Sequence, residues 1–239
     1  MTDRGQRVVS MQSSLFPLFL RLTGRRCLVV GAGAIAESKI ESLLRAGARV
    51  KVVAPKATDK VRSWARAKQI VWRAREYRPA DLAGAFLVIA ATSSPALHRA
   101  IFRQARRSGA LCNAVDDPPN CDFYYPAVVR RGSLQIAIST SGESPSLAAR
   151  LRAELERQFG PEYGAWVKRL GRARAGILRR VLDPEKKRKM LHRQASAAGF
   201  RSFRRDKTEP IRLKQARRSI RSNQPNRSNR ARKRLHAED

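Results

Sequence analysis

Short apolar runs alternate with longer amphipathic stretches along the first half of the chain. Runs such as "CLVV" and "FLVIAA" are too short and too uniformly apolar for amphipathic helices, and they are typical of strands that are buried on both faces. "RVKVV" and "IVWRA" are bounded by turn residues and also favour strands. The predicted strands are 27–30, 49–53, 70–74, 86–91 and 110–115.

The segments between these strands carry helix signals. Apolar residues recur at helical spacing over 35–44, and Gly47 follows as a C-terminal cap. Ser94 and Pro95 supply an N-cap and a first-turn proline for a helix that we expect to end near Ser108. Strands alternating with helices predict an α/β fold with a doubly wound parallel sheet, whose ligands bind beyond the carboxyl ends of the strands.

The pattern changes after Asp116. "YYPAVV" and "SLQIAIS" flank a short turn and predict an antiparallel hairpin, and two helices are expected after it, ending near Gly160 and Val181. From about Phe203 large apolar residues are scarce, so this segment is expected to be disordered. We therefore predict four parts: an α/β domain over 1–115, a strand-containing region over 116–160, a helical part over 161–200 and a basic, disordered tail over 201–239.

The chain is strongly basic throughout. It has 51 Lys and Arg against 19 Asp and Glu, a formal charge of +32, which favours anionic partners such as nucleic acid, phospholipid headgroups or polycarboxylates. From Asp183 onward 19 basic residues face 6 acidic ones, but the body is basic too. Because the tail lacks interleaved aromatic residues and zinc ligands, it does not favour sequence-specific nucleic-acid recognition.

The three cysteines and three histidines show no metal-ligand spacing. We expect free thiols and no metal site. "MQSSLFPLFLRL" is too short for a signal peptide and is divided by Pro17, and no run approaches the roughly 20 apolar residues of a membrane span. A cytoplasmic protein without a membrane partner is expected.

"GAGAIA", beginning at Gly31, matches a dinucleotide-binding turn between a strand and a helix. Gly31 permits the tight turn, Gly33 lets the backbone approach a pyrophosphate, and the helix N-terminus offers free N–H groups. The acid that usually binds the adenine ribose is missing, because the second strand is followed by Pro55 and Lys56. The residues leave NAD and NADP open.

Two adjacent carboxylates, Asp116 and Asp117, follow the fifth strand at the same rim. They are explained equally well by turn chemistry before Pro118 and by a general base that faces a nicotinamide ring.

The hydroxyl-rich stretch "STSGESPS" over 139–146 has two readings as well, an anion site or an ordinary helix cap. A Ser-His-Asp hydrolase is not supported, because there is no nucleophile elbow and His98 lies inside a predicted helix.

"FPLFLRLTGRRCLVVGAGAIAESK", "VIAAT", "CNAVDDPPNCDFYYPAVVRRGSLQIAIST" and "SGESPSLAARLR" together resemble the precorrin-2 dehydrogenase family of sirohaem synthesis. The resemblance covers about 15–159. It implies a Rossmann-type parallel sheet that binds NAD, a small strand-containing dimerisation and substrate region, and a helical C-terminal part. It also implies NAD-dependent oxidation of precorrin-2 to sirohydrochlorin by a homodimer.

The resemblance also assigns residues. Asp116 matches the carboxylate proposed as the base. The expected cofactor-binding residues are Gly31, Gly33, Ala34, Ile35, Pro55, Lys56 and Thr92. The expected substrate-binding residues are Asn113, Ser139, Thr140, Ser144, Arg130, Arg131 and Arg150. The arginines are a hypothesis from their position, because they flank the hairpin and the serine-rich turn and precorrin-2 carries many carboxylates.

Two alternatives accompany this reading. Some family members also insert Fe²⁺ to give sirohaem, so a bifunctional dehydrogenase and ferrochelatase is one, with Fe²⁺ as substrate. A redox sensor of the same fold, whose basic tail binds nucleic acid, is the other and is less favoured.

Overall fold

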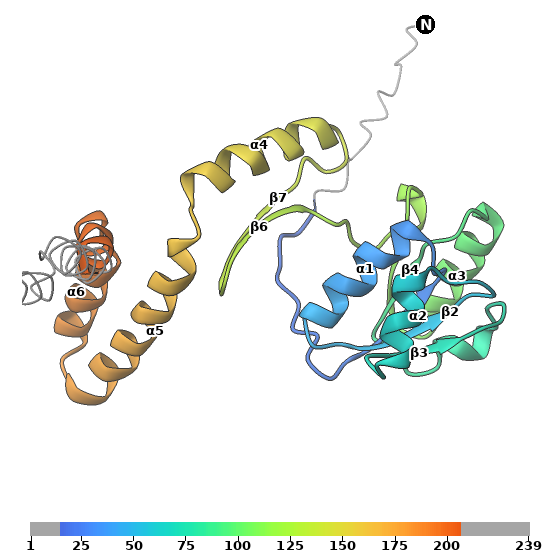
Figure 1. The fold of residues 1–239 in the computed structure, drawn as a ribbon, viewed down its shortest axis with the longest axis horizontal. Coiled ribbons are helices and arrows are strands. Elements are labelled where there is room, and N and C mark those ends of the chain that lie inside the picture. Colours follow the sequence, from blue (N-terminus) through green and yellow to red (C-terminus); the bar gives the residue numbers. More distant parts are fainter. Residues whose placement is uncertain (1–14, 207–239) are drawn as a thin grey trace, which may run out of the picture. The chain divides into compact units, whose positions relative to one another are not determined.

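A five-stranded parallel sheet forms the centre of the first of two compact units. The computed structural model describes residues 15–206. Of these, the first unit holds 15–126 and 139–145, and the second holds 127–138 and 146–206. The strands are β1 (Arg26–Val30), β2 (Arg49–Val53), β3 (Ile70–Arg73), β4 (Leu87–Ala90) and β5 (Leu111–Ala114) (Figure 1). Their order is β3-β2-β1-β4-β5 with all neighbours parallel, which confirms the predicted doubly wound sheet.

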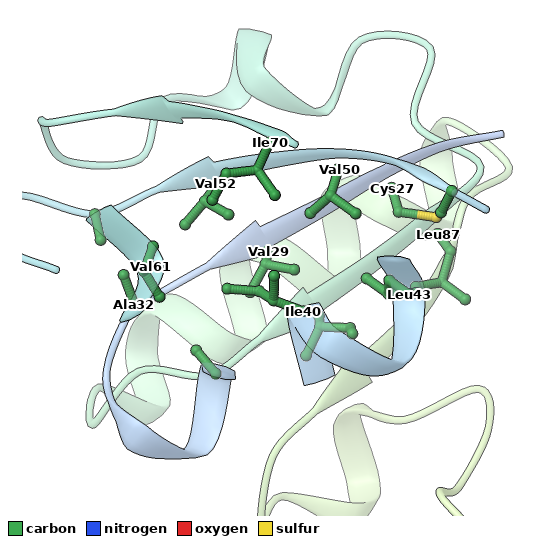
Figure 2. Close-up of a cluster of buried hydrophobic side chains, with 14 of the residues drawn as sticks. Cys27, Val29, Ala32, Ile40, Leu43, Val50, Val52, Val61, Ile70 and Leu87 are labelled. Carbon is green, nitrogen blue, oxygen red and sulfur yellow. The ribbon is translucent and has the colours of Figure 1, made fainter. Parts of the chain in front are cut away.

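Helices bury both faces of this sheet. The helices are α1 (Ala34–Arg45), α2 (Asp59–Arg66) and α3 (Pro95–Arg107). On β1, Cys27 and Val29 pack in the cluster that contains Ile40 of α1 and Val61 of α2 (Figure 2). Leu28 and Val30, one residue out of phase, belong to the cluster that α3 covers on the other face. This double burial is why the strands are apolar at every position rather than alternating.

A side-chain cap begins α3 and a glycine follows the end of α1, both where the sequence predicted. The Ser94 hydroxyl accepts a hydrogen bond from the Leu97 N–H at 3.3 Å at the start of α3. Gly47 follows α1 with a φ of +75°, in the left-handed region that glycine adopts without strain. These local signals therefore define the βαβ units.

A buried carboxylate joins three segments at the edge of the first unit. Asp81 lies in a 3-10 turn (Pro79–Leu82) and is 5% exposed. Its oxygens accept hydrogen bonds from the Arg75 guanidinium at 2.7 and 2.8 Å, and Lys51 Nζ lies 2.8 Å from Oδ1. These cations and the Arg78 N–H hold the pKa of Asp81 well below its usual range.

The second unit begins with the predicted hairpin. Strands β6 (Ala127–Arg131) and β7 (Leu134–Ile138) pair antiparallel, and α4 (Pro145–Gln158), α5 (Glu162–Arg180) and α6 (Pro184–Ala195) follow. The hairpin turn at Gly132, with a φ of +60°, approaches α5 at Gly164 so closely that a Cβ on Gly132 would lie 3.3 Å from the Gly164 Cα. The turn and the helix therefore pack backbone to backbone.

An aromatic cluster joins α5 to a further helical stretch at 197–206. The centroid of the Phe200 ring lies 4.5 Å from that of the Tyr163 ring and 4.7 Å from that of the Trp166 ring, with the rings tilted, and Phe203 is buried. The expectation of a disordered tail from 201 is therefore wrong for 201–206, because these aromatic side chains supply the apolar contact that the composition did not reveal. The rest of the predicted tail, 207–239, lies outside the described residues.

Candidate functional site

A hollow of about 760 Å³ opens at the carboxyl ends of β1, β4 and β5. β1 and β4 are adjacent in the sheet, although β2 and β3 lie between them in the sequence. This is the position where doubly wound sheets bind ligands, and residues that follow β1, β4 and β5 line it. The lining residues are Gly33, Ala34, Ile35, Ala36, Ala91, Thr92, Ser93, Pro95, His98, Arg99, Val115, Asp116 and Asp117.

Gly31 lets the turn after β1 pass very close to the backbone at the end of β4. Its φ is +108°, and a Cβ there would lie only 2.8 Å from the Ala91 carbonyl carbon. The Ala91 N–H donates to the Val30 carbonyl at 2.8 Å, which draws the end of β4 against the turn. Only glycine fits at this position, for the steric reason that the motif predicted.

The N-terminus of α1 faces the hollow without a side-chain cap. Its N-cap is Gly33, and no side chain bonds to the first turn. A Cβ on Gly33 would meet nothing within 4 Å, so open space adjoins the helix end. Free N–H groups at a helix N-terminus bind phosphate groups through hydrogen bonds and the helix dipole. The open space beside the end of α1 can therefore take a pyrophosphate. The residues present therefore fit a dinucleotide.

Asp116, which also lines the hollow, has an unusual backbone conformation. Its φ is +57°, and its side chain is exposed. The turn is closed by the Asp117 N–H, which donates to the Ala114 carbonyl at 3.3 Å. Aspartate tolerates the left-handed region better than most residues, and such strain persists only where the surroundings are fixed.

The loop after Asp116 is fixed by folding back on β5. The Asn113 amide donates to the Phe123 carbonyl at 2.8 Å, and the Asp122 carboxylate accepts from the Cys112 N–H at 2.9 Å. Asn113 is buried and does not line the hollow. Its side chain therefore holds the loop that carries Asp116. The sequence analysis had expected Asn113 to bind substrate and did not foresee this structural role.

A half-buried ammonium group on α1 interacts electrostatically with Asp116. Lys39 Nζ on α1 lies 3.9 Å from the centroid of the Tyr125 ring, a cation–π contact. Burial lowers the pKa of Lys39, and the negative charge of Asp116 opposes that shift. Lys39 thus places a positive charge in the electrostatic surroundings of Asp116.

The hollow also contains polar residues that the sequence analysis did not assign to it. His98 and Arg99 come from the first turns of α3, and Ser93 from the turn before it. The sequence could have indicated these residues, because α3 follows a predicted strand whose carboxyl end was expected to adjoin the ligand. His98 is 5% exposed, and its Nδ1 lies 3.5 Å from Asp117 Oδ2.

Of the other expected cofactor residues, Thr92 lines the hollow, whereas Pro55 and Lys56 do not. Pro55 and Lys56 follow β2 and are exposed. The Ala54 carbonyl before them accepts a hydrogen bond from the Trp72 indole at 3.0 Å. Thr92 lines the hollow, and its hydroxyl accepts from the Ser94 N–H at 3.4 Å. The structure therefore assembles Gly33, Ala34, Ile35 and Thr92 with Asp116 in the first unit.

The serine-rich segment forms a tight turn by itself. The Thr140 hydroxyl accepts from the Ser144 N–H and the Ser139 hydroxyl from the Ser141 N–H, each at 3.1 Å. Ser141 and Gly142 both have positive φ. These bonds use the hydroxyls of Ser139 and Thr140 within the turn.

The three arginines expected to bind substrate belong to the second unit. Arg150 pairs with Glu154 at 3.1 Å, and Arg130 donates to Gln135. Arg131 donates to the Phe159 carbonyl at 2.7 Å and to the Glu156 carbonyl at 3.0 Å. Arg131 therefore satisfies carbonyls at the end of α4.

The cysteines are free thiols. Burial raises the pKa of Cys27 to about 11 and that of Cys112 to about 12. Across residues 15–206, no group of three or more His, Cys, Asp or Glu side chains is arranged to hold a metal ion, and no helix is both long and apolar enough to cross a membrane.

Comparisons with known proteins agree with this geometry. Residues 18–127 match a family described as NAD(P)-binding, and residues 131–158 match the sirohaem biosynthesis protein central family. Siroheme synthase of Neisseria meningitidis (strain FAM18) is 38% identical over 179 residues, 75% of this chain and 37% of that protein. The siroheme synthase of Nitrosococcus oceani is 38% identical over 165 residues, 69% of this chain and 35% of that protein. The chain thus spans less than two-fifths of either relative.

A solved structure is similar over most of the chain. It is that of SirC, a precorrin-2 dehydrogenase, with 27% identity and a TM-score of 0.67, covering 80% of this chain and 98% of that one.

Proposed function

We propose that the chain is a member of the precorrin-2 dehydrogenase and sirohaem synthase family and that it oxidises precorrin-2 to sirohydrochlorin with NAD as hydride acceptor. The observation that carries the proposal is the hollow at the end of β1, β4 and β5, which joins the dinucleotide turn at Gly33 to the carboxylate of Asp116.

Different residues of the hollow serve the two parts of the reaction. The uncapped N-terminus of α1 binds the pyrophosphate through its N–H groups, with Gly33 leaving room for it. NAD, when bound, supplies the nicotinamide that accepts a hydride. Asp116 accepts the proton that the substrate loses with the hydride. Lys39 on α1 places a positive charge near Asp116.

The remaining parts of the proposal rest on the family. We assign 116–160 to substrate binding and dimerisation in a homodimer, 161–200 to the helical C-terminal part, and the protein to the cytoplasm, where free thiols persist. The exposed arginines Arg130 and Arg150 supply charge that suits a polycarboxylate. Metal insertion with Fe²⁺ as substrate at Asp116 is the second candidate, because the same carboxylate would take the protons that a macrocycle releases.

Two assays test these two candidate functions. Purified protein with precorrin-2 and NAD⁺ should form NADH, and Asp116→Asn should lower kcat by about 100-fold while NAD⁺ binds with unchanged affinity. Wild-type kcat in this variant contradicts the role of Asp116, and absence of NADH with the wild-type protein contradicts the dehydrogenase. Sirohydrochlorin with Fe²⁺ and no NAD⁺ tests metal insertion, where a rate equal to the protein-free background removes that candidate.

A further inference from the structure

The histidine in the wall of the hollow has no role in the chemistry described so far. His98 lies on the buried face of α3, in line with Ile101 and Ala105. Its Nε2 is buried and has no hydrogen-bond partner among the described residues. An unsatisfied buried polar atom destabilises a fold, and an aliphatic side chain would avoid that penalty. A buried imidazole at this position therefore calls for an explanation other than packing.

The other ring nitrogen supplies one. Nδ1 of His98 lies 3.5 Å from Oδ2 of Asp117, in a side chain that is only 6% exposed. The same Oδ2 accepts a hydrogen bond from the Asn120 amide at 2.8 Å. Asp117 thus lies against His98 of α3 on one side and is hydrogen-bonded within its own loop on the other.

Asp117 in turn closes the turn that carries Asp116. The Asp117 N–H donates to the Ala114 carbonyl at 3.3 Å, and its carbonyl accepts from the Asn120 N–H at 3.0 Å. Asp116 lies inside this turn with a φ of +57°. A left-handed aspartate keeps that conformation only while its neighbours are fixed, so the position of the Asp116 carboxylate depends on where Asp117 is held.

We propose that His98 is a positioning residue that, through Asp117, holds the Asp116 carboxylate in place for proton removal. The inference rests on the proposed function, since it gives Asp116 a reaction to serve. His98 and both aspartates line the same hollow, yet Nε2 of His98 is buried from solvent. His98 therefore acts through the turn, and its buried Nε2 takes no part in proton transfer.

Variants at residue 98 separate this role from packing. Asparagine places an amide nitrogen near the position of Nδ1, glutamine places one near Nε2, and leucine has neither. We expect His98→Leu to lower kcat at least about tenfold, because small displacements of a catalytic group have large effects on rate. The NAD⁺ Kd should stay within about twofold and the unfolding midpoint should not fall. His98→Asn should recover most of kcat, and His98→Gln should not.

Two controls bear on the pathway through Asp117. Asp117→Asn should lower kcat, and the double variant with His98→Leu should lower it no further, because both changes interrupt one connection. Ile101→Val trims the same face of α3 without touching Asp117, so it should lower the unfolding midpoint and leave kcat unchanged. Full kcat in His98→Leu, or equal recovery by asparagine and glutamine, overturns the proposal.

Hydrogen exchange tests the inference without the reaction. The amide protons of Asp117 and Asn120 should exchange faster in His98→Leu than in the wild-type protein and His98→Asn. If the wild-type protein does not oxidise precorrin-2, the proposed function fails while this measurement still decides the role of His98. Unchanged exchange at both amides refutes it.

Discussion

Replacing Gly33 with alanine separates the stability of the first unit from its capacity to bind NAD. Gly33 has a φ of −83° and a ψ of −174°, an extended conformation that alanine adopts without strain. A Cβ there would meet no atom within 4 Å. Alanine restricts the unfolded chain more than glycine does, but it is a poorer N-cap residue. Because these two effects oppose each other, Gly33→Ala should leave the free energy of unfolding within about 1 kcal/mol of the wild-type value.

The same methyl group should weaken cofactor binding. Gly33 lines the hollow at the uncapped end of α1, where the proposed pyrophosphate approaches the backbone. A methyl group in that space should raise the NAD⁺ Kd at least tenfold, about 1.4 kcal/mol. Calorimetric titration with NAD⁺ and urea unfolding monitored by circular dichroism measure the two quantities on the same sample.

Two other glycines provide the controls. Gly171→Ala, in α5 and also with open space around its Cβ, should stabilise its helix by roughly 0.5–1 kcal/mol and leave the NAD⁺ Kd unchanged. Gly31→Ala, with a φ of +108° and a Cβ 2.8 Å from the Ala91 carbonyl carbon, should destabilise the unit by about 1–3 kcal/mol. An unchanged NAD⁺ Kd in stable Gly33→Ala protein would refute the assignment of this turn to the pyrophosphate.

The remaining predictions concern charged residues. Asp81→Asn should lower the free energy of unfolding by about 2–3 kcal/mol at pH 7, because it leaves the Arg75 guanidinium without its carboxylate. Since the pKa of Asp81 is lowered by folding, its contribution is present above the ordinary carboxyl pKa of about 3.9 and is lost on acidification. Denaturation curves of the variant and the wild-type protein should therefore converge as the pH falls below that value, and a constant difference down to pH 2 speaks against the ion pair. Arg131→Met should lower the unfolding midpoint by removing the bonds to the end of α4 while KM for precorrin-2 stays within about twofold; a KM rise without loss of stability would return Arg131 to substrate binding. Charge reversal at Arg130 and Arg150 together should raise that KM at least about tenfold through lost attraction for carboxylates, and an unchanged KM in steady-state kinetics counts against their role.

Much of the first unit was predictable because its signals are local. The uniformly apolar strands follow from burial on both faces, and the capping hydroxyl of Ser94 and the φ of Gly47 occur where the sequence pattern placed them. Gly31 was predictable for the same reason, since the close approach of β4 at that turn belongs to the motif itself.

The networks that hold the site were not predictable in this way. Asp81 meets Lys51 across 30 positions of sequence, and His98 meets Asp117 across 19. No local period encodes such pairs, because each depends on how strands and helices are brought together. Asn113 shows the same limit: the sequence placed it at the rim, and the structure turns its amide inward to hold the loop.

Charge was the least informative signal at single positions. The basic composition predicted an anionic partner, but it could not tell an arginine that faces solvent from one that binds carbonyl groups. Arg131 is of the second kind. The apolar contacts of Phe200 and Phe203 were hidden for a related reason, since a few aromatic residues order a segment whose average composition favours disorder.

The close contact of Gly132 with Gly164 has a practical consequence for protein engineering. Hairpin tips are usually the places where a chain accepts inserted tags, loops or new termini. Here the tip between β6 and β7 packs directly on α5, and a Cβ on Gly164 would lie 3.2 Å from the Arg131 carbonyl. An epitope or fluorophore inserted at this turn would separate the hairpin from its helix, so labels for following this unit belong on the exposed face of α6 instead.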